Sequence, residues 1–254
     1  MQFVFDLDGT ICFKGKPISE RLLCALEGLI EAGHEVVFAS ARPIRDMLPV
    51  VDQRFHQLLF IGGNGSLISQ AGKRLPGEAF TAEQISKILE LITAYQGTYL
   101  IDSEWDYAYT GASDHPILNN VDPLKLAKKV PVESLNTIVK ILILSSVNME
   151  RLFAELAALE LVVHQYSREN VLDLSPQNIH KWSALQKAGL QAKQFIAFGN
   201  DANDISMFQA ALYSVRIGDH AELGPYATAS IAVEGDYEGA IIEKIEQLSK
   251  AYAL

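Results

Sequence analysis

The sequence predicts an α/β fold with a doubly wound parallel sheet, into which a second unit of the α+β class is inserted. Two observations predict the sheet: short apolar runs alternate with helical patterns at both ends of the chain, and several runs end in polar or glycine-rich turns. A third predicts the insert, because strand-like runs dominate the middle of the chain. With 254 residues, nearly half of them apolar, the chain is long enough for two modest cores.

The amino-terminal part of the sheet follows from three apolar runs. Residues 3–5 form a short run without polar alternation, which is typical of a strand buried on both faces. Ser19 then caps a helix with apolar residues at helical spacing, and Gly33 ends it. Strand-like runs follow at 35–39 and 58–61. The order strand, helix, strand indicates a βαβ unit with parallel strands.

The same alternation returns near the carboxyl end. We expect a helix that ends at Gly189, and after it the following elements: a strand at 195–198, a helix at 205–210, a strand at 213–217, a strand at 230–233 and a helix at 239–248. These segments would complete the sheet begun by the first strands.

The insert has a different pattern of expected helices and strands. Thr81 and Gln84 form a capping box in front of an apolar helical face. The other expected elements are strands at 98–102, 107–110, 137–144, 161–164 and 171–174, and a helix near 149–158. We therefore predict a discontinuous core of residues 1–77 and 178–254 that carries an inserted domain of residues 78–177.

Two carboxylates directly follow the first strand. Asp6 and Asp8 precede Gly9 and Thr10, at the carboxyl end of a strand where open α/β sheets bind ligands. Like charges this close repel, so the pair implies a hard metal ion or a raised pKa. A simple turn made by Asp8 and Gly9 is the alternative.

Further polar groups follow the other predicted strands. Ser40 comes after the strand at 35–39, and the glycine-rich segment 62–66 with Asn64 comes after the next one. A second acidic cluster, residues 199–204, follows the strand at 195–198. Asparagine and aspartate also cap helices, so capping and metal binding are both open for this cluster.

Together these motifs resemble those of the haloacid dehalogenase (HAD) superfamily, and the resemblance covers nearly the whole chain. The Cof-type branch has a Rossmann-like core and a large α/β cap at this insertion point. The resemblance implies that Asp6 is a nucleophile that forms an aspartyl-phosphate and that Asp8 is the acid/base. It also implies that Ser40 donates a hydrogen bond to the phosphoryl group and that Lys181 offsets negative charge. Ala41 stands where the family usually has glycine.

The resemblance further implies a Mg²⁺ cofactor. Its expected ligands are Asp6, Asp8 through the backbone carbonyl, Asn200 and Asp204. The family pattern has aspartate at the position of Asn200, so the metal should bind more weakly here, or Asp201 or Asp204 should compensate.

The expected substrate side of the site consists of the residues that would contact the substrate. We assign Thr10, Arg42, Asn64 and Asn203 to it. Arg42 and Arg45 are either anion contacts or exposed. An acidic and aromatic cluster in the insert either closes over a polar leaving group or packs a sheet: Asp102, Glu104, Trp105, Tyr107 and Tyr109.

Composition narrows the class of function. A formal charge of −10 and a pI near 5.1 disfavour nucleic acid or an anionic membrane as partner. Only Cys12 and Cys24 are present, and there is no leader or apolar run of about 20 residues, so we expect a cytoplasmic protein.

The resulting hypothesis is a Mg²⁺-dependent phosphatase of small phosphorylated metabolites, above all sugar phosphates. The alternatives are a phosphomutase of the same superfamily and a catalytically weak phosphate-ligand binding protein.

Overall fold

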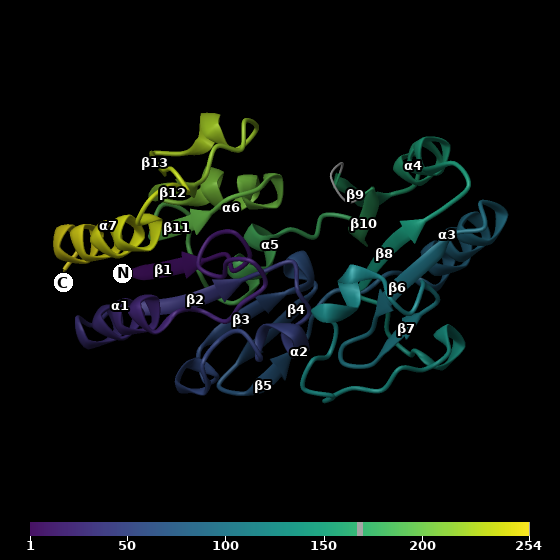
Figure 1. Ribbon diagram of the computed structural model, residues 1–254, viewed down its shortest axis with the longest axis horizontal. Helices are drawn as coiled ribbons and strands as arrows, with labels where there is room; N and C mark the ends of the chain where they lie inside the picture. Colours follow the sequence, from purple (N-terminus) through teal and green to yellow (C-terminus); the bar gives the residue numbers. More distant parts are fainter. Residues whose placement is uncertain (167–169, 254) are drawn as a thin grey trace.

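The computed structural model describes residues 1–166 and 170–253, which form two lobes (Figure 1). The larger lobe contains an eight-stranded sheet of order β13-β12-β11-β1-β2-β3-β4-β5. The smaller contains a five-stranded sheet of order β7-β6-β8-β10-β9. We call the first sheet with its helices the core, and the second with its helices the cap.

The strands of the core are β1 (Gln2–Phe5), β2 (Glu35–Ala39), β3 (Leu59–Gly62), β4 (Leu67–Gln70), β5 (Lys73–Leu75), β11 (Phe195–Gly199), β12 (Tyr213–Ile217) and β13 (Ala229–Ile231). Those of the cap are β6 (Thr98–Asp102), β7 (Tyr107–Tyr109), β8 (Lys140–Ser145), β9 (Leu161–Tyr166) and β10 (Val171–Pro176). Short 3-10 helices lie at Gln53–Phe55, Gly63–Gly65, Pro116–Asn119, Val132–Ser134, Ala202–Asp204 and Gly224–Tyr226.

Helices cover both faces of the core sheet. On one face, α1 (Glu20–Glu31) and α7 (Tyr237–Ala251) pack against Phe3 and Phe5 of β1. On the other, α5 (Lys181–Lys187) and α6 (Ile205–Ala210) pack against Val4. Because successive side chains of a strand point to opposite faces, one short apolar run serves two hydrophobic layers, as the doubly wound prediction requires. The short helix α2 (Ile44–Met47) follows β2.

The cap sheet is covered on one face by α3 (Ala82–Ala94) and α4 (Met149–Ala157). Ile101, Ile141 and Leu172 point into that apolar layer. Strand alternation therefore turns the neighbouring side chains of the same strands toward the opposite face. Two of these neighbours, Lys140 and Asp102, contact the core.

The predicted fold class is confirmed, with one addition. Six strands, from β13 to β3, are parallel to their neighbours, but β4 and β5 extend this sheet as an antiparallel hairpin that the sequence did not reveal. These strands have only four and three residues, and β5 is exposed, so they carry little hydrophobic pattern. The capping box of Thr81 and Gln84 is present in front of α3. Among the described residues, no helix is long and apolar enough to cross a membrane.

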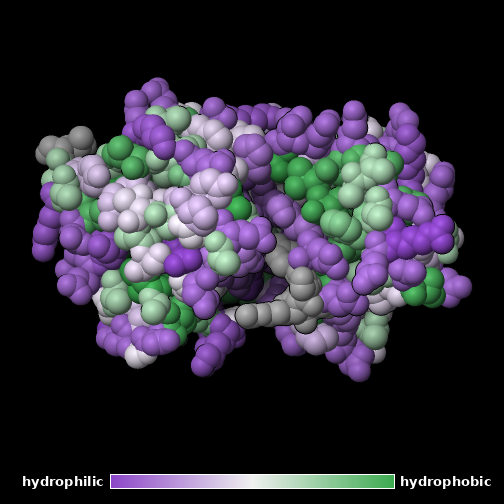
Figure 2. Space-filling model, turned by 90° about the horizontal axis from the view of Figure 1, so that it is seen from above, coloured by the Kyte–Doolittle hydropathy of each residue, from purple (hydrophilic) through white to green (hydrophobic). Residues whose placement is uncertain are grey.

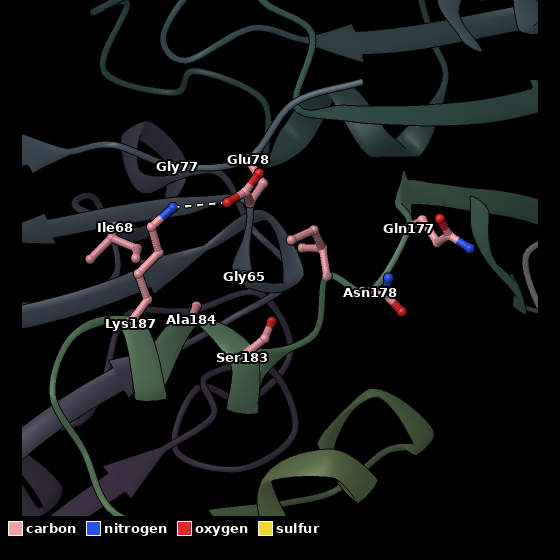
Figure 3. Close-up of a pocket in the computed structure, with 10 residues that line it drawn as sticks. Gly65, Ile68, Gly77, Glu78, Gln177, Asn178, Ser183, Ala184 and Lys187 are labelled. Carbon is pink, nitrogen blue, oxygen red and sulfur yellow. Dashed lines mark hydrogen bonds and ion pairs between the residues drawn. The ribbon is translucent and has the colours of Figure 1, made fainter. Parts of the chain in front are cut away.

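Two connections join core and cap, one between β5 and α3 and the other between β10 and α5. Both run against the segment 63–66. A Cβ on Gly77 would collide with the backbone oxygen of Ser66, and one on Gly65 would lie 2.6 Å from that of His180. A cavity of about 290 Å³ lies here, bridged by the Glu78–Lys187 ion pair of 2.9 Å (Figure 3).

Candidate active site

The polar residues that follow three core strands meet at one edge of the sheet. In the parallel register, Phe5 of β1 lies beside Phe38 of β2 and Phe198 of β11. The next residues along these strands lead to Asp6, Ser40 and Asn200, which therefore lie at neighbouring strand ends.

Lys181 lies at the centre of a buried ionic trio. Its Nζ is 2.6 Å from Oδ1 of Asp6 and 2.6 Å from Oδ1 of Asp204. Lys181 and Asp204 are inaccessible to solvent, and Asp6 is 4% exposed. With two carboxylates and one ammonium, the trio carries a net negative charge when all three groups are ionised.

Burial and charge displace the pKa values of this trio. Burial raises the pKa of Asp6 to about 7 against the opposing effect of Lys181, and the negative charges of Asp204 and Asp8 add to the rise. Burial alone would lower the pKa of Lys181, but the carboxylates of Asp204 and Asp6 outweigh it and raise the pKa to about 12. The lysine therefore remains a fixed positive charge beside a carboxylate that lacks full compensation.

Local helix chemistry places Lys181 in this position. Nδ1 of His180 accepts a hydrogen bond from the backbone N–H of Ser183, so His180 caps α5 and Lys181 becomes its first residue. Trp182 points the other way and stacks on Phe195, with ring centroids 5.4 Å apart. The residues that flank the lysine thus serve helix capping and packing.

The turn after β1 holds the second oxygen of Asp6. Oγ1 of Thr10 donates to Oδ2 of Asp6 at 2.9 Å and lies 3.4 Å from Oδ1 of Asn200. Gly9 has a φ of 77°, and a Cβ there would overlap the side-chain amide of Asn200. Glycine is therefore required at position 9, both for the backbone angle and for the approach of Asn200.

The oxygen atoms around Asp6 suit a hard cation. Within the described chain, no three His, Cys, Asp or Glu side chains converge as a metal site, so a ligand set has to include amide or backbone oxygens. Asn200 supplies an amide oxygen and Asp6 a carboxylate oxygen next to Thr10. Both oxygens of Asp204 accept bonds from protein groups, one from Lys181 and the other from the backbone N–H groups of Asn200 and Asp201. The buried negative charge and the all-oxygen donors fit Mg²⁺.

Asp8 is bound by Arg42 through two hydrogen bonds. Nε and Nη2 of Arg42 each lie 2.6 Å from a carboxylate oxygen of Asp8. The arginine side chain is 11% exposed and the aspartate side chain 49%. Oγ of buried Ser40 accepts from the backbone N–H of Arg42 at 3.1 Å. Ala41 does not have a positive φ, so a Cβ is tolerated at this position of the loop.

Asn64 connects three parts of the molecule. Its Nδ2 donates to Oδ2 of Asp173 in the cap at 3.2 Å, and its Oδ1 accepts from Nδ2 of Asn203 at 3.1 Å. Asp173 also pairs with Lys140 of β8 at 3.0 Å. Asn64 and Asn203 thus lie at the contact between core and cap.

Arg45 is neither exposed nor placed among the groups around Asp6. Its guanidinium is inaccessible to solvent, donates to both oxygens of Asp46, and lies 2.7 Å from Oδ1 of Asp102 in the cap. It also donates to the carbonyl of Trp105 and lies 5.1 Å from the ring centre of Tyr107. Asp102, Trp105 and Tyr107 therefore take part in joining the cap to the core.

A large cavity opens beside the site, and the surface between the two lobes is hollowed in Figure 2. Its volume is about 840 Å³, in the range of pockets for small organic molecules. Gly9, Asn200 and Asn203 line it from the core, and Phe153 and His164 from the cap. A molecule bound here would touch both lobes.

Lys140 and Asp173 were missed at the level of sequence. Each is a charged residue inside an apolar strand, and such a residue needs a partner when it is buried. That interruption of the hydrophobic pattern is the signal that could have identified them.

Comparisons with known proteins identify the family. Residues 3–232 match the family model described as haloacid dehalogenase-like hydrolase. A protein of Mycoplasma pneumoniae that is provisionally named a phosphatase is 24% identical, over 93% of either chain. The 5-amino-6-(5-phospho-D-ribitylamino)uracil phosphatase YitU of Bacillus subtilis is 21% identical over 84% of this chain and 85% of its own.

Solved structures share the fold. A haloacid dehalogenase-like hydrolase from Bacteroides thetaiotaomicron superimposes with a TM-score of 0.79 at 21% identity, covering 97% of this chain and 98% of its own. A HAD subclass IIB sugar phosphatase superimposes with a TM-score of 0.75 at 17% identity, covering 98% and 96%.

Proposed function

The chain belongs to the haloacid dehalogenase-like hydrolases, and from that premise we propose that it is a Mg²⁺-dependent phosphatase of small phosphate monoesters, above all sugar phosphates. One observation carries the proposal. The Asp6 carboxylate is fixed at the end of β1 by Lys181 on one oxygen and Thr10 on the other, next to a cavity that reaches the cap. A fixed carboxylate beside a buried cation is suited to attack phosphorus.

The proposed reaction has two displacements at phosphorus. In the first, a carboxylate oxygen of Asp6 bonds to phosphorus, the bond from phosphorus to the ester oxygen breaks, and Asp8 gives a proton to the leaving oxygen. In the second, Asp8 takes a proton from water as the water oxygen bonds to phosphorus. The bond between phosphorus and Asp6 then breaks, which releases inorganic phosphate and restores the enzyme.

Neighbouring residues would hold the transferring group. The hydroxyl of Ser40 accepts from a backbone N–H, so its own proton can be donated to a phosphoryl oxygen. Lys181 supplies a positive charge beside the reacting oxygen of Asp6. Arg42 positions Asp8 through its paired hydrogen bonds.

Asp6, the backbone carbonyl of Asp8 and Asn200 would hold Mg²⁺. Asp204 would not bind the metal directly but would orient the residues around it, because its oxygens already accept hydrogen bonds from Lys181 and from the backbone of Asn200. When bound, Mg²⁺ supplies charge neutralisation for the phosphoryl oxygens.

Several observations support the substrate class. One structural neighbour is named a sugar phosphatase, and one relative acts on a phosphorylated ribitylamino-uracil according to its name. The net charge of −10 and the two free cysteines support a cytoplasmic enzyme that acts on small phosphorylated metabolites rather than on nucleic acid or a membrane.

A panel of phosphorylated sugars, nucleotides and cofactors, assayed for phosphate release with Mg²⁺, tests the proposal. We expect turnover that is lost in Asp6→Asn and after chelation of the metal. Turnover that persists in Asp6→Asn would exclude the covalent route. Transfer of phosphate to a second position of the sugar without release would indicate a mutase, and tight binding without turnover would indicate a binding protein.

A further inference from the structure

Three successive backbone carbonyls in the loop after β2 are held by donors from different lobes. The oxygen of Ser40 accepts from the backbone N–H of Asn64 at 3.1 Å, and that of Arg42 from the N–H of Gly63 at 2.8 Å. Both donors belong to the core. The carbonyl between them, that of Ala41, accepts from Nζ of Lys140 at 2.7 Å, and Lys140 belongs to the cap.

Lys140 is an unusual residue for its place. It begins β8 between the buried side chains of Val139 and Ile141, and it is itself only 5% exposed. Burying an ammonium group costs free energy unless it is paired and hydrogen-bonded. Asp173 supplies the opposite charge at 3.0 Å, and Ala41 supplies an acceptor in the other lobe. An apolar residue would pack here without this cost, so packing alone does not account for the lysine.

The carbonyl that Lys140 holds lies between two residues with proposed roles in the reaction. On one side is Ser40, whose hydroxyl accepts from the N–H of Arg42. On the other is Arg42, whose side chain binds both oxygens of Asp8. A change at Ala41 of even a fraction of an ångström would be passed to both neighbours through the backbone.

We propose that Lys140 is a positioning residue for phosphoryl transfer. When the cap is docked on the core, its ammonium group fixes the Ala41 carbonyl and so sets the orientation of Ser40 and of the Arg42–Asp8 pair. Because the donor comes from the cap, the loop is held at all three carbonyls only in the docked arrangement. Cap docking and the chemical step are thereby coupled. For its chemistry this inference rests on the proposed phosphatase function.

The first test measures steady-state hydrolysis of p-nitrophenyl phosphate with Mg²⁺. Lys140→Met keeps most of the side-chain length but removes the donor, and we expect kcat to fall on the order of 10²-fold with little change in KM. Lys187→Met is the matched control, because it also removes a lysine from an ion pair, but at the connection with Glu78. We expect its kcat to stay within about threefold of the parent. Equal kcat values for Lys140→Met and the parent would overturn the proposal.

The second test does not depend on turnover. Amide hydrogen exchange in peptides that cover residues 40–42 should accelerate by about tenfold in Lys140→Met and stay unchanged in Lys187→Met. An inactive parent enzyme would contradict the phosphatase proposal and leave this measurement intact. Reduced kcat with unchanged exchange would overturn the positioning role, because Lys140 would then act on the substrate directly.

A folding defect is handled by a double variant. Lys140→Met alone leaves the Asp173 carboxylate buried without its lysine, which can unfold the protein. Lys140→Met combined with Asp173→Asn removes both charges and still deprives Ala41 of its cap donor. We expect a folded protein with the same loss of kcat and the same faster exchange. Normal values of both in the double variant would overturn the proposal.

Discussion

Lys181 and Arg45 are two buried cations that each pair with two carboxylates, and the molecule uses them differently. Lys181 joins Asp6 and Asp204 within the core at 2.6 Å. Arg45 joins Asp46 of the core and Asp102 of the cap at 2.8 and 2.7 Å. Both cations are inaccessible to solvent. The same electrostatic unit thus occurs once at the candidate active site and once at the contact between lobes.

The difference lies in how completely the partners are engaged. Arg45 uses Nε, Nη1 and Nη2 to bind Asp46, Asp102 and the carbonyl of Trp105, which ties two lobes together. Lys181 offers a compact charge on one oxygen of Asp6, and within the described chain the other oxygen accepts from the hydroxyl of Thr10. A rigid fork suits a joint, whereas a point charge suits an atom whose bonding changes during a reaction.

The largest expected effect comes from Lys181→Met. Hydrolysis of p-nitrophenyl phosphate should fall by about 10³-fold, because a charge that stabilises the transferring group is lost. The protein should also lose stability, since Asp6 and Asp204 would remain buried without their cation. Adding Asp204→Asn should restore much of the denaturant midpoint but not the activity. Recovery of activity in the double variant would mean that Lys181 has a structural role only.

Arg45→Met should show the opposite profile. We expect the free energy of unfolding to fall by about 3–5 kcal/mol, because Asp46 and Asp102 would be buried unpaired. Where the variant is folded with its cap docked, Lys140 still holds the Ala41 carbonyl, so kcat should stay within about threefold of the parent. Urea denaturation and the same hydrolysis assay measure the two quantities.

A surface network supplies the control for Arg45. Arg54 also binds three carboxylates, those of Glu20, Glu27 and Asp52, but all of these side chains are partly or fully exposed. Arg54→Met should therefore lower the denaturant midpoint much less than Arg45→Met does. Similar midpoints for the two variants would remove the distinction between a buried joint and an exposed network.

Sequence reasoning found Lys181 but not the role of Arg45, and the reason is physical. Asp6, Ser40 and Asn200 follow apolar strands, so local pattern and parallel register together bring them to one sheet edge. Lys181 was assigned through its position at the start of the helix that returns to the core. No local pattern marks Arg45, because its partner Asp102 lies 57 residues further along the chain.

The contacts between cap and core could not be predicted for the same reason, because their partners are far apart in the sequence. Lys140 reaches Ala41, which is 99 residues away, and Asn64 reaches Asp173, which is 109 residues away. The insertion of a cap could be predicted because strand-like runs replace the alternation of strands and helices in the middle of the chain. The orientation in which the cap docks could not be predicted. The interruption of apolar strands by a charge at Lys140 and Asp173 is a sequence feature that could have indicated buried partners for these two residues.

A smaller effect is expected at the neutral amide beside Asp6. Asn200→Asp would add a negative charge to the proposed metal ligands, so the Kd for Mg²⁺ should fall on the order of tenfold by isothermal titration calorimetry. Asp201→Asn is the control, because the Asp201 side chain binds His220 and the N–H of Ala202 instead. An unchanged Kd in Asn200→Asp would contradict the assignment of residue 200 as a ligand.

The smallest expected effect is a difference in stability between two substitutions of Asn64, which distinguishes the role of its backbone conformation from that of its side chain. Asn64 has a φ of 58° and bonds Asp173 and Asn203 through its amide. Asn64→Gly can still adopt this left-handed backbone conformation but loses the side-chain bonds. It should lower the free energy of unfolding by about 1–2 kcal/mol. Asn64→Ala loses the same bonds and adds the strain of a left-handed conformation, roughly 1 kcal/mol more. Equal stabilities of the two variants in urea titrations would show that the loop relaxes, and that Asn64 joins core and cap through its amide alone.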